Sequence, residues 1–183
     1  WQICKVYRDG ESGRSHNPEF TMIEWYRLGM DHHALMSDVE RLIGAMLPPS
    51  RAFDRSEGLT YREAVQLHAG IDPFDDPLAV LIARLESAEI EVPRDVKNDR
   101  DACLDLIMGI LVGPQLGHDR LTFIYDYPAS QAALAQIRGP VASRFEAYMD
   151  GLELCNGFHE LANATEQRTR FERDLAERAK RGL

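Results

Sequence analysis

The sequence predicts an α+β fold in which helices pack on a mixed, mainly antiparallel sheet. Strand-like segments lie mainly at the two ends of the chain, within residues 3–27 and 121–158, and helical patterns fill the middle. Strands and helices in separate blocks are typical of this class. At 183 residues, with no internal repeat, the chain has the length of one domain.

Two hairpins account for most of the predicted strands. A polar loop joins the first two segments, which we expect to pair antiparallel. Asp150-Gly151 is a strong signal for a two-residue turn, so the segments on either side of it predict a second hairpin. The predicted strands are 3–8, 20–27, 121–127, 143–149 and 152–158.

Apolar residues at helical spacing predict the helices, and capping signals place their ends. Pro48-Pro49 ends the first helix, and Gly113-Pro114 ends a later one. Thr60 with Glu63 forms a capping-box pattern. The predicted helices are 31–47, 60–69, 76–86 with Pro77 in the first helical position, 99–111, and one from Asn163 or Thr165 to about 181.

Composition excludes several classes of protein. The hydrophobic fraction is 44% and the charged fraction 28%, as in globular domains. No apolar run approaches the roughly 20 residues of a membrane span. The net charge of −9 argues against general nucleic-acid binding. Three widely spaced cysteines without a CxxC motif indicate neither zinc nor disulfides, which favours the cytoplasm.

The loop between the first two strands is the most informative segment. Within residues 7–20 it holds two arginines, a histidine and two glycines, a composition that can wrap a polyphosphate. Strand alternation then places Phe20, Met22, Glu24 and Tyr26 on one face of the second strand. An aromatic platform, a carboxylate and a phenol suit a nucleotide base beside an organic cation.

These residues resemble a known family. The segment HNPEFTMIEWY is similar to motif 2 of class II aminoacyl-tRNA synthetases, in the form found in lysyl-tRNA synthetases. The loop GESGR and Trp25 look more like the paralogous elongation factor P lysine ligases. The runs FIYDYPASQAALAQI, EAYMDGLELCNGFHEL and TEQRTRFERDLAERAKRGL extend the resemblance over nearly the whole chain. It implies an antiparallel core, with residues 31–115 as a helical insertion between motifs.

The resemblance implies an ATP site in the first hairpin. Arg8 would hold the α-phosphate and the substrate carboxylate, where a guanidinium stabilises the charge of the transition state. His16 would reach the γ-phosphate with help from Arg14, and Phe20 would stack under adenine. The family has a glutamate where this chain has Gly10. Glu11 takes over that contact only if the loop shifts.

The resemblance also implies a site for a lysine-like substrate. Glu24 would bind an amino group, which fits the high cost of burying a carboxylate without a cation, and Tyr26 would add a hydrogen bond. Asn156, Phe158 and Glu160 share a face by alternation and would close the pocket. His159 then turns away from that face and is interpreted as structural.

Glu146 and Glu153 match the family's magnesium ligands. If Asp150-Gly151 is a two-residue turn, Glu153 faces Tyr148 and lies diagonally from Glu146, about 7 Å away. Strict alternation, however, places Glu153 and Asn156 on opposite faces, although the family uses both at one site. A bulge near Cys155 or Gly157 would remove this conflict.

Other residues are assigned no role in the ligand site. Adjacent histidines on a helix point apart, so Asp31-His32-His33 is interpreted as a solvated helix start rather than a metal site. Tyr125, Tyr127, Ser130 and Gln131 belong to the ligase-like run and are expected near the site without assigned roles.

The resulting prediction is an ATP-dependent ligase with Mg²⁺ that activates lysine or β-lysine as an adenylate and transfers it to elongation factor P. The alternatives are a lysyl-tRNA synthetase fragment that charges tRNA and a catalytically inactive binding module. Motifs 1 and 3 are not recognised, so we expect a piece of a longer, homodimeric protein. We expect the piece alone to turn over little or not at all.

Overall fold

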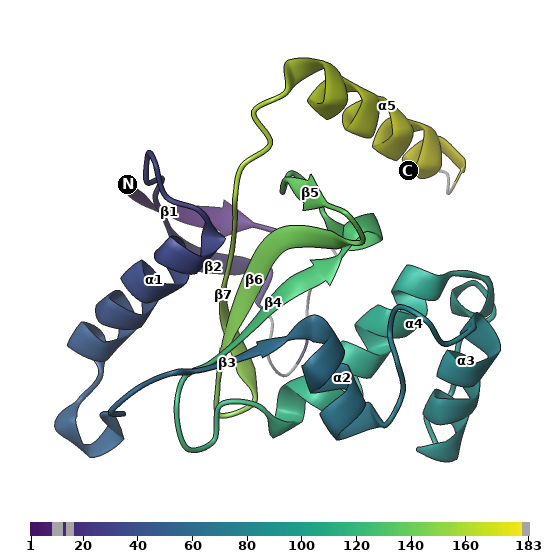
Figure 1. Cartoon of the computed structure of the whole chain (residues 1–183), viewed down its shortest axis with the longest axis horizontal. Coiled ribbons are helices and arrows are strands. Elements are labelled where there is room, and N and C mark those ends of the chain that lie inside the picture. The colour runs from purple at the N-terminus through teal and green to yellow at the C-terminus, as the bar shows by residue number, and fades with distance from the viewer. Residues whose placement is uncertain (9–12, 14–16, 181–183) are drawn as a thin grey trace. The chain divides into compact units, whose positions relative to one another are not determined.

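A computed structural model describes residues 1–8, 13 and 17–180 of the chain. The chain divides into two compact units, Trp1–Met30 and Asp31–Leu183, which are described separately (Figure 1). Among the described residues, no helix has both the length and the apolar character that crossing a membrane requires.

The first unit is an antiparallel hairpin. β1 (Gln2–Tyr7) pairs with β2 (Glu19–Glu24), and the register sets Val6 opposite Phe20. The predicted pairing is confirmed, but the predicted strand end is wrong. β2 ends at Glu24, so Tyr26 lies beyond the strand and does not share its face.

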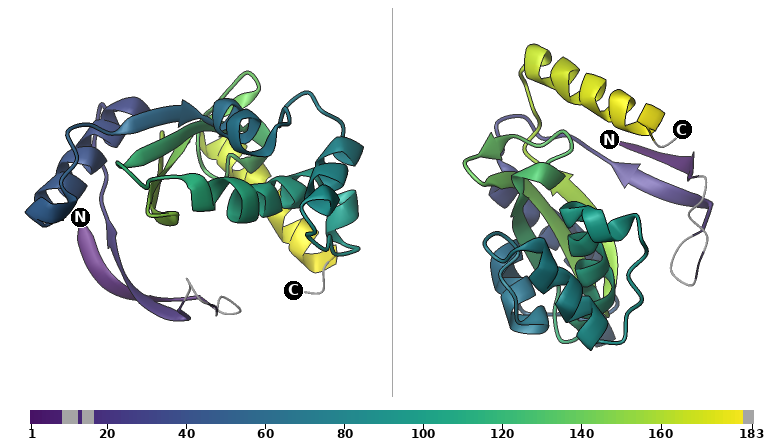
Figure 2. Two further views of the ribbon diagram at one scale, coloured as in Figure 1. Left: turned by 90° about the horizontal axis from the view of Figure 1, so that it is seen from below. Right: turned by 90° about the vertical axis from the view of Figure 1, so that its right-hand side faces the viewer.

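The second unit is built on a mixed sheet whose central strand is β6 (Figures 1 and 2). β4, β7 and the short β5 each pair with β6, and all three pairings are antiparallel. β3 adds to β4 in parallel, a strand that the sequence did not reveal. The strands are β3 (Glu57–Thr60), β4 (Thr122–Pro128), β5 (Ile137–Arg138), β6 (Val141–Met149) and β7 (Leu152–Phe158).

The predicted helices are confirmed, with small differences at their ends. Asn163 accepts hydrogen bonds from two backbone amides at the start of α5 and is therefore its cap. Pro77 caps α3 rather than occupying its first position. The fourth helix changes into a π-helix over Ile107–Val112. The helices are α1 (His32–Met46), α2 (Tyr61–Ala69), α3 (Leu78–Ser87), α4 (Arg100–Leu106) and α5 (Ala164–Lys180).

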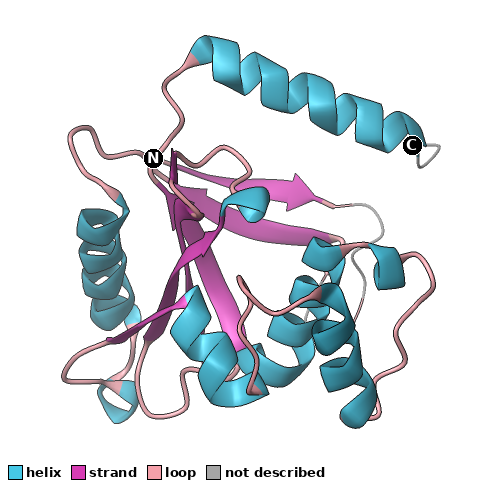
Figure 3. Cartoon of the chain, turned by 45° about the vertical axis from the view of Figure 1, so that its right-hand side comes forward, coloured by secondary structure: helices cyan, strands magenta, loops and turns pink. Residues whose placement is uncertain are grey.

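The helices of the second unit cover both faces of its sheet (Figure 3). Phe123 and Phe145 pack edge to face on the side of α1, with ring centroids 5.7 Å apart. On the other face, Tyr61 of α2 packs on Tyr127 of β4 at 4.8 Å. Both tyrosines belong to the main buried core. β6 is therefore packed from both sides, which explains its burial.

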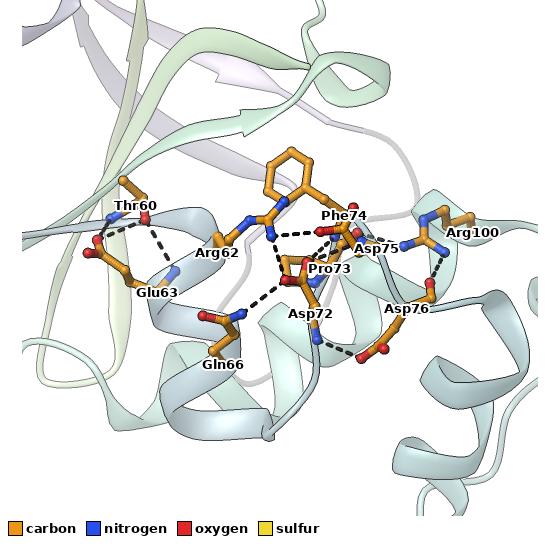
Figure 4. A network of polar contacts seen from close by, with 10 residues as sticks. All are labelled: Thr60, Arg62, Glu63, Gln66, Asp72, Pro73, Phe74, Asp75, Asp76 and Arg100. Carbon is orange, nitrogen blue, oxygen red and sulfur yellow. Dashed lines mark hydrogen bonds and ion pairs between the residues drawn. The ribbon is translucent and has the colours of Figure 1, made fainter. Parts of the chain in front are cut away.

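A polar network ties α2 to the turn that precedes α3 (Figure 4). The Arg62 guanidinium donates to Asp72 at 2.6 Å and to Asp75 at 2.8 Å, and it stacks on Phe74. Arg100 donates to the backbone oxygens of residues 73 and 76, both at 2.7 Å. These contacts satisfy the turn's polar groups, so we assign the network a structural role.

Candidate functional site

Arg8 and Phe20 are neighbours in the first unit. Arg8 follows β1 directly, and its backbone amide donates to Pro18 O at 2.9 Å. Its guanidinium carbon lies 5.3 Å from the centroid of the Phe20 ring, a cation–π distance. The hairpin thus presents a cation and an aromatic face side by side.

Glu24 shares a strand face with Phe20 and Met22, as predicted. Its carboxylate accepts a 2.6 Å hydrogen bond from the Gln2 side chain directly across the hairpin. Glu24 is half-buried, so its carboxylate is only partly removed from water. Tyr26, in contrast, is 79% exposed beyond the strand end. Glu24 therefore lies on the predicted face of the hairpin, whereas Tyr26 does not.

Three residues of the predicted ATP site, Glu11, Arg14 and His16, lie outside the described residues. Their roles remain predictions.

A bulge in β7 brings the second group of predicted residues onto one face. Glu153 pairs with Tyr148, whereas Cys155 pairs with Ala147, so Leu154 is an extra residue between them. Asn156 then pairs with Glu146. Glu146 and Tyr148 are two residues apart on β6, so their side chains lie on the same face of the sheet. Their respective partners, Asn156 and Glu153, therefore lie on that face too. The predicted position of Glu153 opposite Tyr148 is confirmed, and the bulge lies next to Cys155.

Arg144 holds this face together. It lies two residues before Glu146 on β6 and donates to the Glu146 carboxylate at 2.5 Å. It also donates to the Asn156 side-chain oxygen and to Gln131 O, both at 3.1 Å. Its guanidinium stacks on Tyr127, 4.5 Å from the ring centroid. A planar, forked donor fixes several acceptors at once, so Arg144 orients both Glu146 and Asn156.

The second oxygen of Glu146 accepts from the Tyr148 hydroxyl at 2.6 Å. Glu146 is only 7% exposed. Burial, followed by the nearby Glu146 charge, raises the pKa of Tyr148 and of Tyr127 far above the ordinary tyrosine range. Burial and Asp101 raise the pKa of Asp105, on α4. Tyr148 therefore stays neutral and donates its hydroxyl hydrogen to Glu146.

Three further predicted residues follow the bulge. Asn156 is exposed, and Phe158 is half-buried and packs against the main core. Glu160 lies two residues beyond β7, in an isolated bridge with Ala135. His159 Nδ1 lies 3.5 Å from Arg138, and its backbone bonds to Ser143 and Gln136. These contacts agree with a structural role for His159.

The carboxylates of Glu146 and Glu153 fit a magnesium ion in charge and placement. Both side chains lie on one face of the β6–β7 hairpin, Glu146 in the pair with Asn156 and Glu153 in the pair with Tyr148. Glu153 is exposed to solvent. Each Glu146 oxygen already accepts one hydrogen bond, but a carboxylate offers about four acceptor positions. Mg²⁺ commonly takes one or two carboxylates together with substrate phosphates.

Sequence reasoning missed Arg144 as a site residue and gave Tyr127 and Gln131 no role. The alternation of residues 143–149 held a usable signal, because it places Arg144, Glu146 and Tyr148 on one face of a buried strand. A guanidinium in such a strand needs partners, and the adjacent carboxylate and phenol are suitable ones. The bulge at Leu154 was expected only from the conflict between strand alternation and the family resemblance.

The sequence profile of the family described as tRNA synthetases class II (D, K and N) matches residues 1–181. The chain is also similar to curated proteins named elongation factor P–(R)-beta-lysine ligase. It is 46% identical to that of Klebsiella pneumoniae subsp. pneumoniae over 186 residues and 46% identical to that of Vibrio vulnificus over 189 residues. Identity to the Photobacterium profundum protein is 44% over 186 residues. Each match covers 100% of this chain and 56% of the relative.

Proposed function

Because the chain belongs to the tRNA synthetases of class II (D, K and N), we propose that it forms part of the active site of an ATP-dependent ligase. The substrates proposed are (R)-β-lysine or lysine and a lysine side chain of elongation factor P. The observation that carries this proposal is the 46% identity over the whole chain to relatives named for that activity. The chain spans 56% of their length, so the activity is proposed for the whole protein.

In the first proposed step, the substrate carboxylate attacks the α-phosphorus of ATP. The bond to the bridging oxygen breaks, and pyrophosphate leaves. Arg8 stabilises the negative charge that develops on the α-phosphate, while Phe20 stacks on adenine. We propose that Arg14 and His16 bind the outer phosphates and that Glu11 contributes an adenine or amine contact.

Glu146 and Glu153 would hold a magnesium ion, which would supply positive charge to neutralise part of the phosphate charge. Arg144 and Tyr148 would hold the Glu146 carboxylate in the orientation that this requires.

In the second proposed step, a neutral lysine amine of elongation factor P attacks the acyl carbon of the adenylate. A C–N bond forms, AMP leaves with the C–O bond electrons, and the amine loses a proton. By the family resemblance, we propose that Glu24 and Tyr26 bind an amino group of the small substrate, and that Asn156, Phe158 and Glu160 bind its side chain.

ATP–pyrophosphate exchange by the whole protein tests the first step. We expect exchange with (R)-β-lysine or (S)-lysine and none without amino acid. Glu24→Gln should raise the KM for the amino acid at least tenfold while leaving the KM for ATP within about twofold, because one charge-assisted contact is lost. Glu19→Gln is the matched control, since Glu19 lies on the opposite face of the same strand and pairs with Lys5 at the surface. Absence of exchange with either amino acid would contradict the proposal.

Two further properties of the whole protein belong to this proposal. We expect a homodimer, which light scattering tests, and a cytoplasmic location, which fractionation tests.

A further inference from the structure

His32 is a buried histidine without hydrogen bonds. It is the first residue of α1 and only 2% exposed, so the predicted solvated helix start is wrong for this residue. Neither ring nitrogen has a hydrogen-bond partner in the described part of the chain. Leaving a buried polar group unsatisfied costs about 1–3 kcal/mol. Nδ1 therefore has no partner in the described part of the chain, and Nε2 has only its 3.4 Å contact with Asp126.

His33 and Asp126 lie beside this ring. The two imidazole centroids are 4.1 Å apart, and His32 Nε2 lies 3.4 Å from Asp126 Oδ1. One nitrogen of each histidine and one Asp126 oxygen all lie within 4.8 Å of one another. Two chain segments produce this arrangement in the second unit: the first turn of α1 supplies both histidines, and β4 supplies the carboxylate.

Asp126 reaches the histidines because β4 bulges at this residue. The β4–β6 register shifts between Tyr125 and Tyr127, and Asp126 has a positive φ of 58°. A bulge redirects a side chain, and a non-glycine residue in this conformation is held there at some cost in strain. The sequence analysis considered the helix alone, on which adjacent histidines diverge, and the bulge could not be foreseen.

We propose that His32, His33 and Asp126 bind a divalent transition-metal ion of the zinc type. Two imidazoles and one carboxylate are ligands that such ions accept, whereas Mg²⁺ and Ca²⁺ prefer all-oxygen sites. Ligands about 2.1 Å from one ion are at most ~4.2 Å apart, so a small side-chain rotation closes the site. His33 is exposed and can make that rotation.

The surroundings favour a cation. Asp31 adds negative charge near both histidines while its oxygen caps α1 by accepting from the Ala34 amide at 2.9 Å. Asp126 is partly exposed, so an ion can enter from solvent. The bound ion would tether the start of α1 to β4.

Zinc titration of the whole, metal-free protein in excess Mg²⁺ tests the site, by calorimetry and by thermal unfolding. We expect one equivalent of Zn²⁺ that raises the Tm. His33→Ala and Asp126→Asn should each weaken this binding at least tenfold and abolish the rise in Tm. Asparagine accepts a positive φ, so Asp126→Asn remains informative if His33→Ala fails to fold.

The matched controls are His118→Ala and Asp119→Asn, an exposed histidine and an exposed aspartate in the loop before β4. They should leave zinc affinity unchanged within about twofold. The proposal is overturned if wild type binds no zinc below ~0.1 mM, or if both site variants retain wild-type affinity. In either case, the buried pair of His32 and Asp126 is a structural contact alone.

Discussion

Glu153 lies directly opposite Tyr148 in the β6–β7 ladder, on the face that also carries Glu146 and Asn156. One extra residue, Leu154, produces this relationship. Without the bulge, alternation would separate Glu153 from Asn156. The arrangement therefore unites the proposed magnesium ligands and one substrate contact on a single surface.

Glu153→Gln tests the proposed metal role. Replacing an ionised carboxylate by an amide should raise the Mg²⁺ concentration for half-maximal pyrophosphate exchange about tenfold, since a charged ligand is lost. The measurement is a Mg²⁺ titration at fixed ATP. Glu91→Gln, at an exposed position outside the sheet, should leave the curve in place. An unchanged Mg²⁺ dependence in Glu153→Gln would remove this residue from the site.

Arg144→Met should destabilise the protein by about 3 kcal/mol, because it leaves the buried Glu146 carboxylate without its charged partner. Arg144→Lys keeps the charge but not the fork, so we expect an intermediate loss. Urea unfolding measures both. Lys97→Met is the control: Lys97 makes a surface pair with Glu86, and its loss should cost less than about 1 kcal/mol. Equal effects at the two positions would show that Arg144 is not a central contact.

Tyr148→Phe and Tyr61→Phe form a matched pair of buried phenol deletions. The Tyr148 hydroxyl donates to Glu146, so its removal should lower the free energy of unfolding by about 1–3 kcal/mol. The Tyr61 hydroxyl has no hydrogen-bond partner among the described residues, so its removal should be neutral or stabilising. Denaturant titration compares the two, and the reverse order would refute the hydrogen-bond assignment.

Gly157→Ala should destabilise by about 1–3 kcal/mol, because the added methyl group would lie 2.4 Å from the Phe145 ring. Gly44→Ala, inside α1 with open space around it, should stabilise by roughly 0.5–1 kcal/mol. Thermal unfolding separates the two signs. A neutral Gly157→Ala would mean that β7 can move away from β6.

The sequence predicted the elements whose ends are set by nearby residues, such as helix caps and tight turns. Thr60 and Glu63 make the expected capping box, and Asp150 and Gly151, both with positive φ, form the expected turn. β3 was missed because four residues, one of them glycine, give little periodic pattern. Its pairing with β4 depends on a contact about 65 residues away in sequence.

The candidate site shows the same contrast between features set by nearby residues and features set by long-range strand pairing. Motif resemblance and alternation predicted Phe20, Glu24, Glu146 and Glu153 as site residues. The bulge in β4 was not predictable, since it depends on how whole strands pair. The bulge in β7 was expected only because the family resemblance conflicted with strict strand alternation. Arg144 lies two residues before Glu146 in the sequence. Its role in holding Glu146 and Asn156 depends on the burial of β6 from both faces of the sheet.

The central claim concerns the acceptor, and a competition assay tests it most directly. The whole protein is given ATP, Mg²⁺ and labelled (R)-β-lysine, with unmodified elongation factor P and tRNA together in one reaction. The account predicts that label accumulates on elongation factor P as a stable amide and that Glu24→Gln loses this transfer while Glu19→Gln keeps it. Label on tRNA as a base-labile ester, or no label on either acceptor, would contradict it.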